Sequence, residues 1–550
     1  MCSQPTVVIT MMAVILAACD RAPGPEAETT LPFNVVETPI GDVDFPVGCS
    51  PEAAPLVERG VALLHHMMYD EARFVFGMAD DRDPDCAMAY WGQAMALIHP
   101  LWPDVPSQAN LERGSWLVEK SLALGGHSER ENAYLQTTRA YFEGGDAVTE
   151  AERLVRFEAA WNSLSRAHPD DLEARAFYSL ALRAIADNSD SELRQQKQAG
   201  LIAESVLAEI PNHPGGHHYV IHAYDYPQLA AKAEKTADHY GEITPKVPHA
   251  THMMTHIYTR LGLWPKAVTW NTISADTAWD MCIQTGEINL HYTHALDYLA
   301  YAHLQMANDG AVLEILETAE ELQPPYSETN RDASAYAFAA LPARYVLERR
   351  DWQAAAQLQP REPASFPWEP SHDAYVAITY FARAIGLARG GRPDAATLDI
   401  RMLGDLKTRI AKSDQYWAMQ IEIQEETARA WQAFAMGDRE SGVERMAHAA
   451  SLEAATVKDA VTPGEVLPSA ELYGDMLLEV GRFKDALLAY ETALARSPRR
   501  YNSLLGAARS AAAGGDVVAA SSYYGELLEI AGKSTGQRES IQEAQAYLEG

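Results

Sequence analysis

The sequence predicts an all-α protein built as a solenoid, in which antiparallel helix pairs stack into one right-handed superhelix. Alanine-rich stretches with helical periodicity dominate the chain, and no convincing run of alternating apolar and polar residues indicates a β-sheet. A set of small, aromatic and proline residues also recurs with the same spacing near both ends of the 550-residue chain. A stack of repeats grows by adding units, so this length requires no division into separate globular domains.

Two units with the same internal spacing begin at residues 53 and 467. Small residues at the eighth and twentieth positions let two helices approach closely, an aromatic at the twenty-fourth fills the groove beside them, and a proline at the thirty-second stops the second helix. The residues are Gly60, Ala72, Phe76, Ala79 and Pro84 in the first unit, and Gly474, Ala486, Tyr490, Ala493 and Pro498 in the second. This spacing is that of the 34-residue tetratricopeptide repeat, a helix-turn-helix unit.

Further units extend the pattern. A third unit begins in register at residue 501, and degenerate units beginning near 211, 248 and 292 keep only the small residue of the twentieth position. The matching residues are Ala508, Ala520 and Tyr524 in the third unit and Ala230, Ala267 and Ala311 in the degenerate ones. We therefore expect residues 48–535 to form the helical superhelix and residues 536–550 to form a C-terminal tail or a last helix.

The first 19 residues indicate a bacterial lipoprotein signal peptide. The apolar run from Val7 to Ile15 is too short to span a bilayer, and it is followed by leucine, two alanines and Cys19, the pattern at which such leaders are cleaved and lipidated. No lysine or arginine precedes the run, so an ordinary uncleaved N-terminus is the alternative. Residues 20–47 are rich in Pro, Glu and Thr and predict a flexible tether. Lipidation at Cys19 would place the protein in the bacterial cell envelope, facing the periplasm.

Three other cysteines then matter, because the periplasm is oxidising. Cys49 precedes the first expected helix and Cys86 opens a helix one repeat later, so both would lie at the same end of adjacent helices. They could form a disulfide, with two free thiols as the alternative. Cys282 is either a buried thiol or a soft metal ligand.

The charge of the chain limits its partners. A net charge of −32 and a pI near 4.9 argue against a nucleic-acid partner and against an anionic membrane surface. We therefore expect no nucleic acid as a partner, and contact with the membrane only through the lipid anchor.

Histidines are concentrated in the middle of the chain, where residues 213–303 contain eleven of the 18. His218 and His222 are four residues apart, and His252 and His256 repeat that spacing 34 residues later. Residues four apart share one face of a helix, and equivalent positions of stacked repeats are neighbours in space. We therefore expect the two pairs to converge on one pocket.

Histidine clusters of this kind are typical of metal sites. His249 and His294 would add further nitrogens, and neutral imidazole binds zinc, copper and nickel. Asp225 and Asp297 each follow a histidine by three residues, so they could accept a second ring proton and fix the tautomer of that ring. The cluster therefore predicts a transition-metal site, with zinc as the expected ion and copper as the alternative.

Other interpretations stay open. Met253 and Met254 lie between His252 and His256, where thioethers would suit Cu(I), but they could simply be core residues. Without metal, the same residues could form a hydrogen-bond network or line a concave groove that binds a protein or peptide. The aromatic companions of such a groove would be Tyr219, Tyr224, Tyr258, Tyr292 and Tyr298.

The chain resembles a family of bacterial tetratricopeptide-repeat proteins over nearly all of residues 48–532. The resemblance rests on five segments: LLHHMMYDEA (63–72), DCAMAYWGQAMALIHPLW (85–102), HPGGHHYVIHAYD (213–225), PHATHMMTHIYTRLG (248–262) and VTPGEVLPSAELYGD (461–475). Members usually carry proline and serine where this chain has Met254 and Thr255. The resemblance implies the fold and little about the chemistry.

Three classes of function follow. The first is a membrane-tethered repeat protein that binds a protein or peptide in its concave groove, and the second is a metal-binding lipoprotein. The third is a metal-dependent hydrolase inside the superhelix, since a bound zinc activates water. The resemblance suggests Glu471 as a weak candidate for its general base, although this residue could instead cap a helix or pair within its own repeat.

Overall fold

The structure is a computed structural model that describes residues 38–102, 105–125, 127–329, 331–459, 461–532 and 538–550. The predicted signal peptide, with Cys19, and residues 20–37 of the predicted tether lie outside these described residues. Within them the chain forms 25 α-helices and three short 3₁₀ helices, and the one β pairing is an isolated bridge between Ile288 and Tyr326. The prediction of an all-α fold is therefore confirmed.

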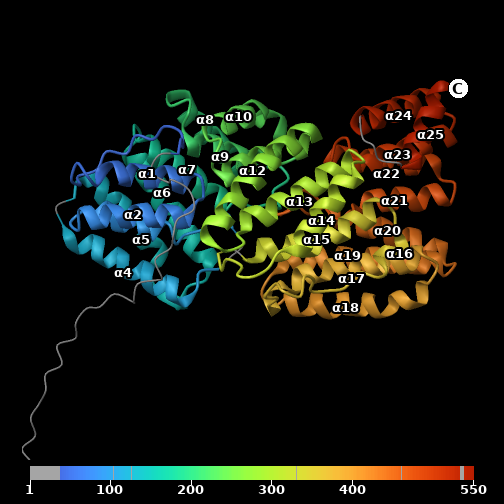
Figure 1. Cartoon of the computed structure of the whole chain (residues 1–550), viewed down its shortest axis with the longest axis horizontal. Helices are drawn as coiled ribbons and strands as arrows, with labels where there is room; N and C mark the ends of the chain where they lie inside the picture. Colours follow the sequence, from blue (N-terminus) through green and yellow to red (C-terminus); the bar gives the residue numbers. More distant parts are fainter. Residues whose placement is uncertain (1–37, 103–104, 126, 330, 460, 533–537) are drawn as a thin grey trace, which may run out of the picture. The chain divides into compact units, whose positions relative to one another are not determined.

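Most helices follow one another with short connections (Figure 1), and longer segments join α16 to η2 and α20 to α21. The N-terminal helices are α1 (Ala54–His65), α2 (Tyr69–Arg82), α3 (Ala87–Met95), α4 (Gln108–Leu124), α5 (Glu129–Phe142), η1 (Gly145–Ala147), α6 (Glu150–Ala167), α7 (Leu172–Ala184) and α8 (Arg194–Glu209). The central ones are α9 (Pro214–Tyr224), α10 (Ala230–Ile243), α11 (Pro248–Leu261), α12 (Trp264–Thr285), α13 (Leu290–Gln305), α14 (Asp309–Glu321), α15 (Arg331–Glu348) and α16 (Trp352–Ala355). The C-terminal ones are η2 (Pro370–His372), α17 (Asp373–Arg389), η3 (Pro393–Ala395), α18 (Ala396–Ile410), α19 (Gln415–Ala435), α20 (Arg439–Ala454), α21 (Ser469–Glu479), α22 (Phe483–Arg496), α23 (Tyr501–Ala513), α24 (Val517–Ala531) and α25 (Glu539–Glu549).

The repeat residues pack as their spacing predicts. The Phe76 ring lies over Gly60 of its own unit and over Gly92 of the next, at both of which an added Cβ atom would stand less than 3 Å from the ring. At the other end of the chain, Tyr490 lies in the same way over Gly474 and Gly506. The same glycine-aromatic-glycine packing at both ends identifies a tetratricopeptide-like solenoid.

Alternate helices form an inner layer that positions the histidines. Most helices pack on the next one in the chain, and α9, α11, α13, α15, α17 and α19 also contact one another in that order. Helix α15 packs mainly on α13 and α17. Helix α1 packs across the array onto α9, and α13 contacts α23. Segments more than 150 residues apart in the sequence therefore meet at the inner layer.

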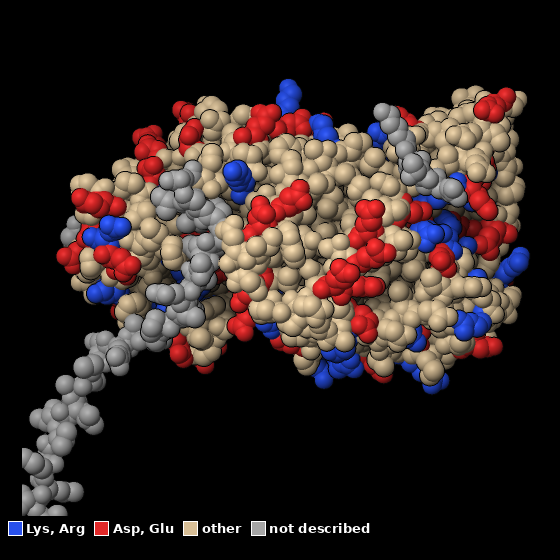
Figure 2. All heavy atoms as spheres, viewed as in Figure 1, with Lys and Arg blue, Asp and Glu red and all other residues tan. Residues whose placement is uncertain are grey.

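The surface carries many carboxylates. Figure 2 shows acidic side chains spread over the face in view, with lysine and arginine side chains between them. Among the described helices, none combines the length and the apolar character needed to cross a membrane.

Candidate metal centre

Three neighbouring helices of the inner layer carry a cluster of buried histidines. Proline at the first turn of α9 and of α11 starts each helix just before its histidines, and Asn289 caps α13 by accepting from the Tyr292 N–H. The rings form a continuous chain of contacts, with centroids 4.3 to 6.4 Å apart. The cluster consists of His218 and His222 on α9, His249, His252 and His256 on α11, and His291 and His294 on α13.

The first group of possible ligands is His218, His222 and His249, whose ring nitrogens lie within 4.8 Å of one another. His218 Nδ1 donates to the carbonyl of His65 at 2.6 Å, which leaves the lone pair on Nε2. That Nε2, the Nε2 of His222 and both ring nitrogens of His249 are buried without a hydrogen-bond partner. Polar atoms in this condition are rare in folded proteins and cost about 1–3 kcal/mol each.

The second group is His252, His256 and His294, again within 4.8 Å. His252 Nδ1 donates to Asn271 Oδ1 at 2.8 Å and His256 Nδ1 donates to Asp225 Oδ2 at 3.1 Å. In this arrangement both Nε2 atoms carry lone pairs, and they face each other at 3.1 Å. The two lone pairs repel unless a metal ion, or a proton carried by one of the two nitrogens, lies between them. His294 contributes a further buried nitrogen, Nδ1, that has no partner.

The rings are held in the neutral form that binds metal. Burial lowers the pKa of His218 to about 3 and that of His291 to about 4. Burial, followed by the mutual repulsion of neighbouring rings, also holds the pKa values of His222, His249 and His252 well below their ordinary value. The cluster therefore presents uncharged imidazoles at neutral pH.

Asp225 orients one of these rings. It follows α9 directly, and it accepts from Arg260 Nε at 2.8 Å and from Lys458 Nζ at 2.9 Å as well as from His256. Burial alone would raise the pKa of Asp225, but Lys458, Arg260 and His256 hold it well below its usual range. The carboxylate therefore stays charged and fixes the tautomer of His256. We expected this role for Asp225, but towards the preceding histidine on α9 rather than towards a histidine on α11.

The structure divides the expected four-histidine site into two triads. Each i, i+4 pair joins one histidine of the next inner helix, which is His249 for the α9 pair and His294 for the α11 pair. The two pairs remain adjacent, because the His222 and His256 ring centroids are 6.0 Å apart. Each pair nevertheless lies closer to a single histidine of the next inner helix, because the ring centroids of His218 and His249 are 5.1 Å apart and those of His252 and His294 are 4.3 Å apart.

Asp297 binds a different partner from the expected one. Its Oδ1 accepts from Arg344 Nε at 3.1 Å, and both side chains are fully buried. Its Oδ2 has no hydrogen-bond partner. Asp297 therefore forms a buried ion pair one turn from His294 and orients no histidine ring.

A third histidine cluster has a complete hydrogen-bond network. Glu173 accepts from His65 Nε2 at 2.6 Å and from His213 Nε2 at 2.9 Å. The other nitrogens accept, His65 Nδ1 from the Tyr219 hydroxyl and His213 Nδ1 from the Gly216 N–H. Burial would raise the pKa of Glu173, but the two histidines hold it far below its usual range. Although its spacing would admit an ion, this cluster needs none.

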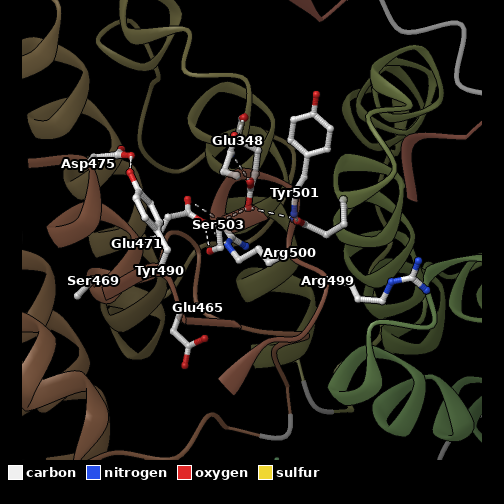
Figure 3. A network of polar contacts seen from close by, with 12 residues as sticks. Glu348, Glu465, Ser469, Glu471, Asp475, Tyr490, Arg499, Arg500, Tyr501 and Ser503 are labelled. Atoms are coloured by element: carbon white, nitrogen blue, oxygen red, sulfur yellow. Dashed lines mark hydrogen bonds and ion pairs between the residues drawn. The ribbon is translucent and has the colours of Figure 1, made fainter. Parts of the chain in front are cut away.

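Glu471 takes part in a separate buried network, drawn in Figure 3. Its carboxylate accepts from Arg500 Nε at 2.7 Å and from Ser503 Oγ at 2.6 Å, and Arg500 also pairs with Glu348 at 2.5 Å. The side chains of Arg500, Glu471 and Glu348 are all fully buried. The carboxylate of Glu471 therefore belongs to an ion-pair network between helices. This is the structural role that we considered as the alternative to a general base.

The connection between α20 and α21 lies on the inner surface. Tyr298 and Tyr336 donate to Thr462, and Arg344 donates to the carbonyls of Gly464 and Glu465 at 2.8 and 2.9 Å. This segment of the chain itself therefore occupies part of the surface expected to bind a peptide. Tyr298 also packs on the rings of His252, His256 and His294.

The cysteines lie away from the histidine triads. Cys49 and Cys86 form a disulfide with a Cα–Cα distance of 4.9 Å, which joins the segment before α1 to the start of α3. Cys282 is a buried free thiol that accepts from the Asn289 N–H at 3.4 Å.

Several residues of the site gave no signal in the sequence. Lys458 reaches Asp225 across 233 positions, and Glu173 reaches His65 across 108. Asn271 lies on α12, the second helix of its pair, which we did not expect to face the cluster. Only the helix stacking brings these residues together.

Comparisons with known proteins add little. No protein-family model and no curated protein match the chain. Yeast Tom70 is similar over 90% of this chain and 95% of its own, at 13% identity and a TM-score of 0.31. The P58(IPK) TPR domain is similar over 90% of this chain and 98% of its own, at 13% identity and a TM-score of 0.19. The APC/C hetero-tetramer Cut9-Hcn1 is similar over 90% of this chain and 96% of its own, at 11% identity and a TM-score of 0.27. The fold assignment therefore rests on the helix pairs and repeat positions of the chain itself.

Proposed function

We propose that this repeat protein binds a transition-metal ion in its buried histidine cluster, and that a lipid on Cys19 tethers it to the bacterial cell envelope, facing the periplasm. The observation that supports the metal is the set of buried imidazole nitrogens without partners. They are Nε2 of His218 and His222, both nitrogens of His249 and Nδ1 of His294.

The fully bonded cluster around Glu173 makes the contrast clear. There, every nitrogen of His65 and His213 has a partner, so the chain evidently can satisfy buried histidines by hydrogen bonding. In the two triads, by contrast, nitrogens with free lone pairs converge from three helices. An ion bound by these lone pairs would take the place of one missing hydrogen bond in each ring.

Zinc is the expected ion. The triads supply only imidazole nitrogen, which suits zinc as well as Cu(II). Met254 packs its methyl group against Gly241 and Met253 is fully buried, which favours the core role of these methionines over Cu(I) binding. Copper is retained as the alternative.

Protein binding is the second candidate function, because solenoids of helix pairs commonly present their inner surface to protein partners. The segment around Thr462 already covers part of the inner surface. We therefore place any protein partner on the part of the inner helices that this segment does not cover. A metal-dependent hydrolase would need a general base other than Glu471, whose carboxylate already binds Arg500 and Ser503.

Elemental analysis and zinc titration of protein without a histidine tag test the proposal. We expect bound zinc in the native protein, and a lower content in His222→Ala and His294→Ala. The matched control is His239→Ala, because His239 is a partly exposed histidine that bonds Glu242 and Asn212 outside the cluster. Absence of metal, or equal loss in all three variants, would mean that the cluster is a polar network.

A further inference from the structure

We infer that the side-chain amide of Asn271 controls access of the ion to the triad of His252, His256 and His294, because it determines which nitrogen of His252 carries the proton. The inference rests on the proposed function, since it concerns how the ligands of the same site become available. Asn271 lies on α12 and is fully buried. It contacts a ligand and not the ion, so it is a positioning residue.

The amide lies in the orientation that suits a metal. Its Oδ1 accepts from His252 Nδ1 at 2.8 Å, so the lone pair of His252 is on Nε2, which lies 3.1 Å from His256 Nε2. Both Nε2 atoms can then bind an ion. Without an ion this orientation is unfavourable, because the two lone pairs face each other and because Asn271 Nδ2 has no hydrogen-bond partner among the described residues.

A turn of about 180° about the last side-chain bond exchanges Oδ1 and Nδ2 of Asn271. Nδ2 then donates to His252 Nδ1, and the proton of His252 moves to Nε2. From there it is donated to His256 Nε2, so the contact at 3.1 Å becomes an N–H···N hydrogen bond. One turn of the amide therefore withdraws two of the three lone pairs that would bind the ion.

Thr255 favours the turned amide in the metal-free protein. Its hydroxyl donates to the His252 carbonyl at 2.6 Å and lies 3.5 Å from Asn271 Oδ1. Because the hydroxyl proton is already used, this oxygen can accept from an N–H but donates poorly to a second acceptor. Thr255 therefore binds Nδ2 better than Oδ1 at that position.

His256 cannot make the same change as His252. Its Nδ1 faces two acceptors, Asp225 Oδ2 at 3.1 Å and the Tyr298 hydroxyl at 3.3 Å, and that hydroxyl donates its own proton to the Thr462 carbonyl. The His256 proton therefore stays on Nδ1, and its Nε2 stays an acceptor. Metal binding then turns the amide and moves the His252 proton from Nε2 to Nδ1, so the number of protons on that ring is unchanged.

The first test measures the zinc dissociation constant of the full-length protein at pH 8, in competition with a chromophoric chelator. Asn271→Asp offers His252 Nδ1 only acceptor oxygens, so it cannot form the turned state and should bind zinc about tenfold more tightly than the wild type. A merely structural role would make this substitution weaken binding. Asn308→Asp is the matched control, since the Asn308 amide bonds His303 Nδ1 at 3.3 Å outside the cluster, and it should leave zinc binding unchanged.

The second test records the ¹⁵N spectrum of the histidine side chains in the wild type, where the His252 signals are identified by their absence in His252→Gln. We expect the proton on Nε2 in the metal-free protein and on Nδ1 after zinc is added. This spectrum decides the matter alone if Asn271→Asp does not fold.

The inference is overturned, while metal binding stands, if the proton is on Nδ1 in both states or if Asn271→Asp binds zinc no more tightly than the wild type does. An equal gain in Asn308→Asp would overturn it as well. If the wild type binds no zinc, the proposed function fails and the inference fails with it.

Discussion

His249 should lower the stability of the metal-free protein. Both of its ring nitrogens are buried without partners, and each such atom costs about 1–3 kcal/mol. Leucine has a similar volume and no polar atom, so His249→Leu removes both penalties and leaves little cavity. The two penalties sum to about 2–6 kcal/mol, and a swap of similar volume costs less than about 1.5 kcal/mol. In EDTA we therefore expect the variant to be more stable than the wild type by at least about 0.5 kcal/mol, even though a buried residue has been replaced.

Zinc should shift this difference in favour of the wild type. Ligand at 100 times its dissociation constant stabilises the state that binds it by about 2.7 kcal/mol, and the variant lacks one of the three ligands of its triad. Urea denaturation followed by circular dichroism, with EDTA and with zinc, measures both differences through the midpoint of unfolding.

The control is His213→Leu in the fully bonded cluster. It removes a partner of Glu173 and of the Gly216 N–H, so it should destabilise the protein by roughly 3–5 kcal/mol with or without zinc. If His249→Leu destabilises the metal-free protein as much as His213→Leu does, the nitrogens of His249 have partners in solution and the argument for a metal is refuted.

Three further predictions concern other parts of the molecule. Burial lowers the pKa of His66 from 6.5 to about 3, so the neutral ring contributes its full stability above pH 6.5 and this contribution is lost as the pH falls towards 3. When the pH is lowered from 7 to 5.5, the unfolding free energy of His66→Gln, measured by urea denaturation, should therefore fall by about 1 kcal/mol less than that of the wild type. An equal fall in both proteins would contradict this. Glu471→Ala leaves buried Arg500 with one carboxylate fewer and should cost roughly 3–5 kcal/mol of unfolding free energy, whereas a loss of bound metal at unchanged stability would return Glu471 to the site. Cys19→Ser should release the protein from the membrane fraction, and its retention there would point to an uncleaved leader acting as the anchor.

The sequence predicts those features of the fold that depend on local spacing. The positions of Gly60 and Phe76 determine how a helix pair packs, and the same spacing recurs at Gly474 and Tyr490, so the solenoid follows from them. The i, i+4 pairs likewise determine which rings share a helix face.

The partners of those rings depend on the path of the whole chain and could not be predicted. His218 donates to the carbonyl of His65 because α1 packs across the array onto α9. Asp297 binds Arg344 on α15, because the inner layer continues beyond α13 and supplies a guanidinium there. No spacing within one repeat signals either contact.

Diffraction at the zinc absorption edge, from crystals of tag-free protein, tests the metal centre most directly. We expect an anomalous peak about 2.1 Å from the nitrogens of one triad, either His252, His256 and His294 or His218, His222 and His249. The contradicting result is a cluster without a peak, in which the Asn271 amide is turned so that Nδ2 donates to His252 and the facing nitrogens of His252 and His256 share a proton.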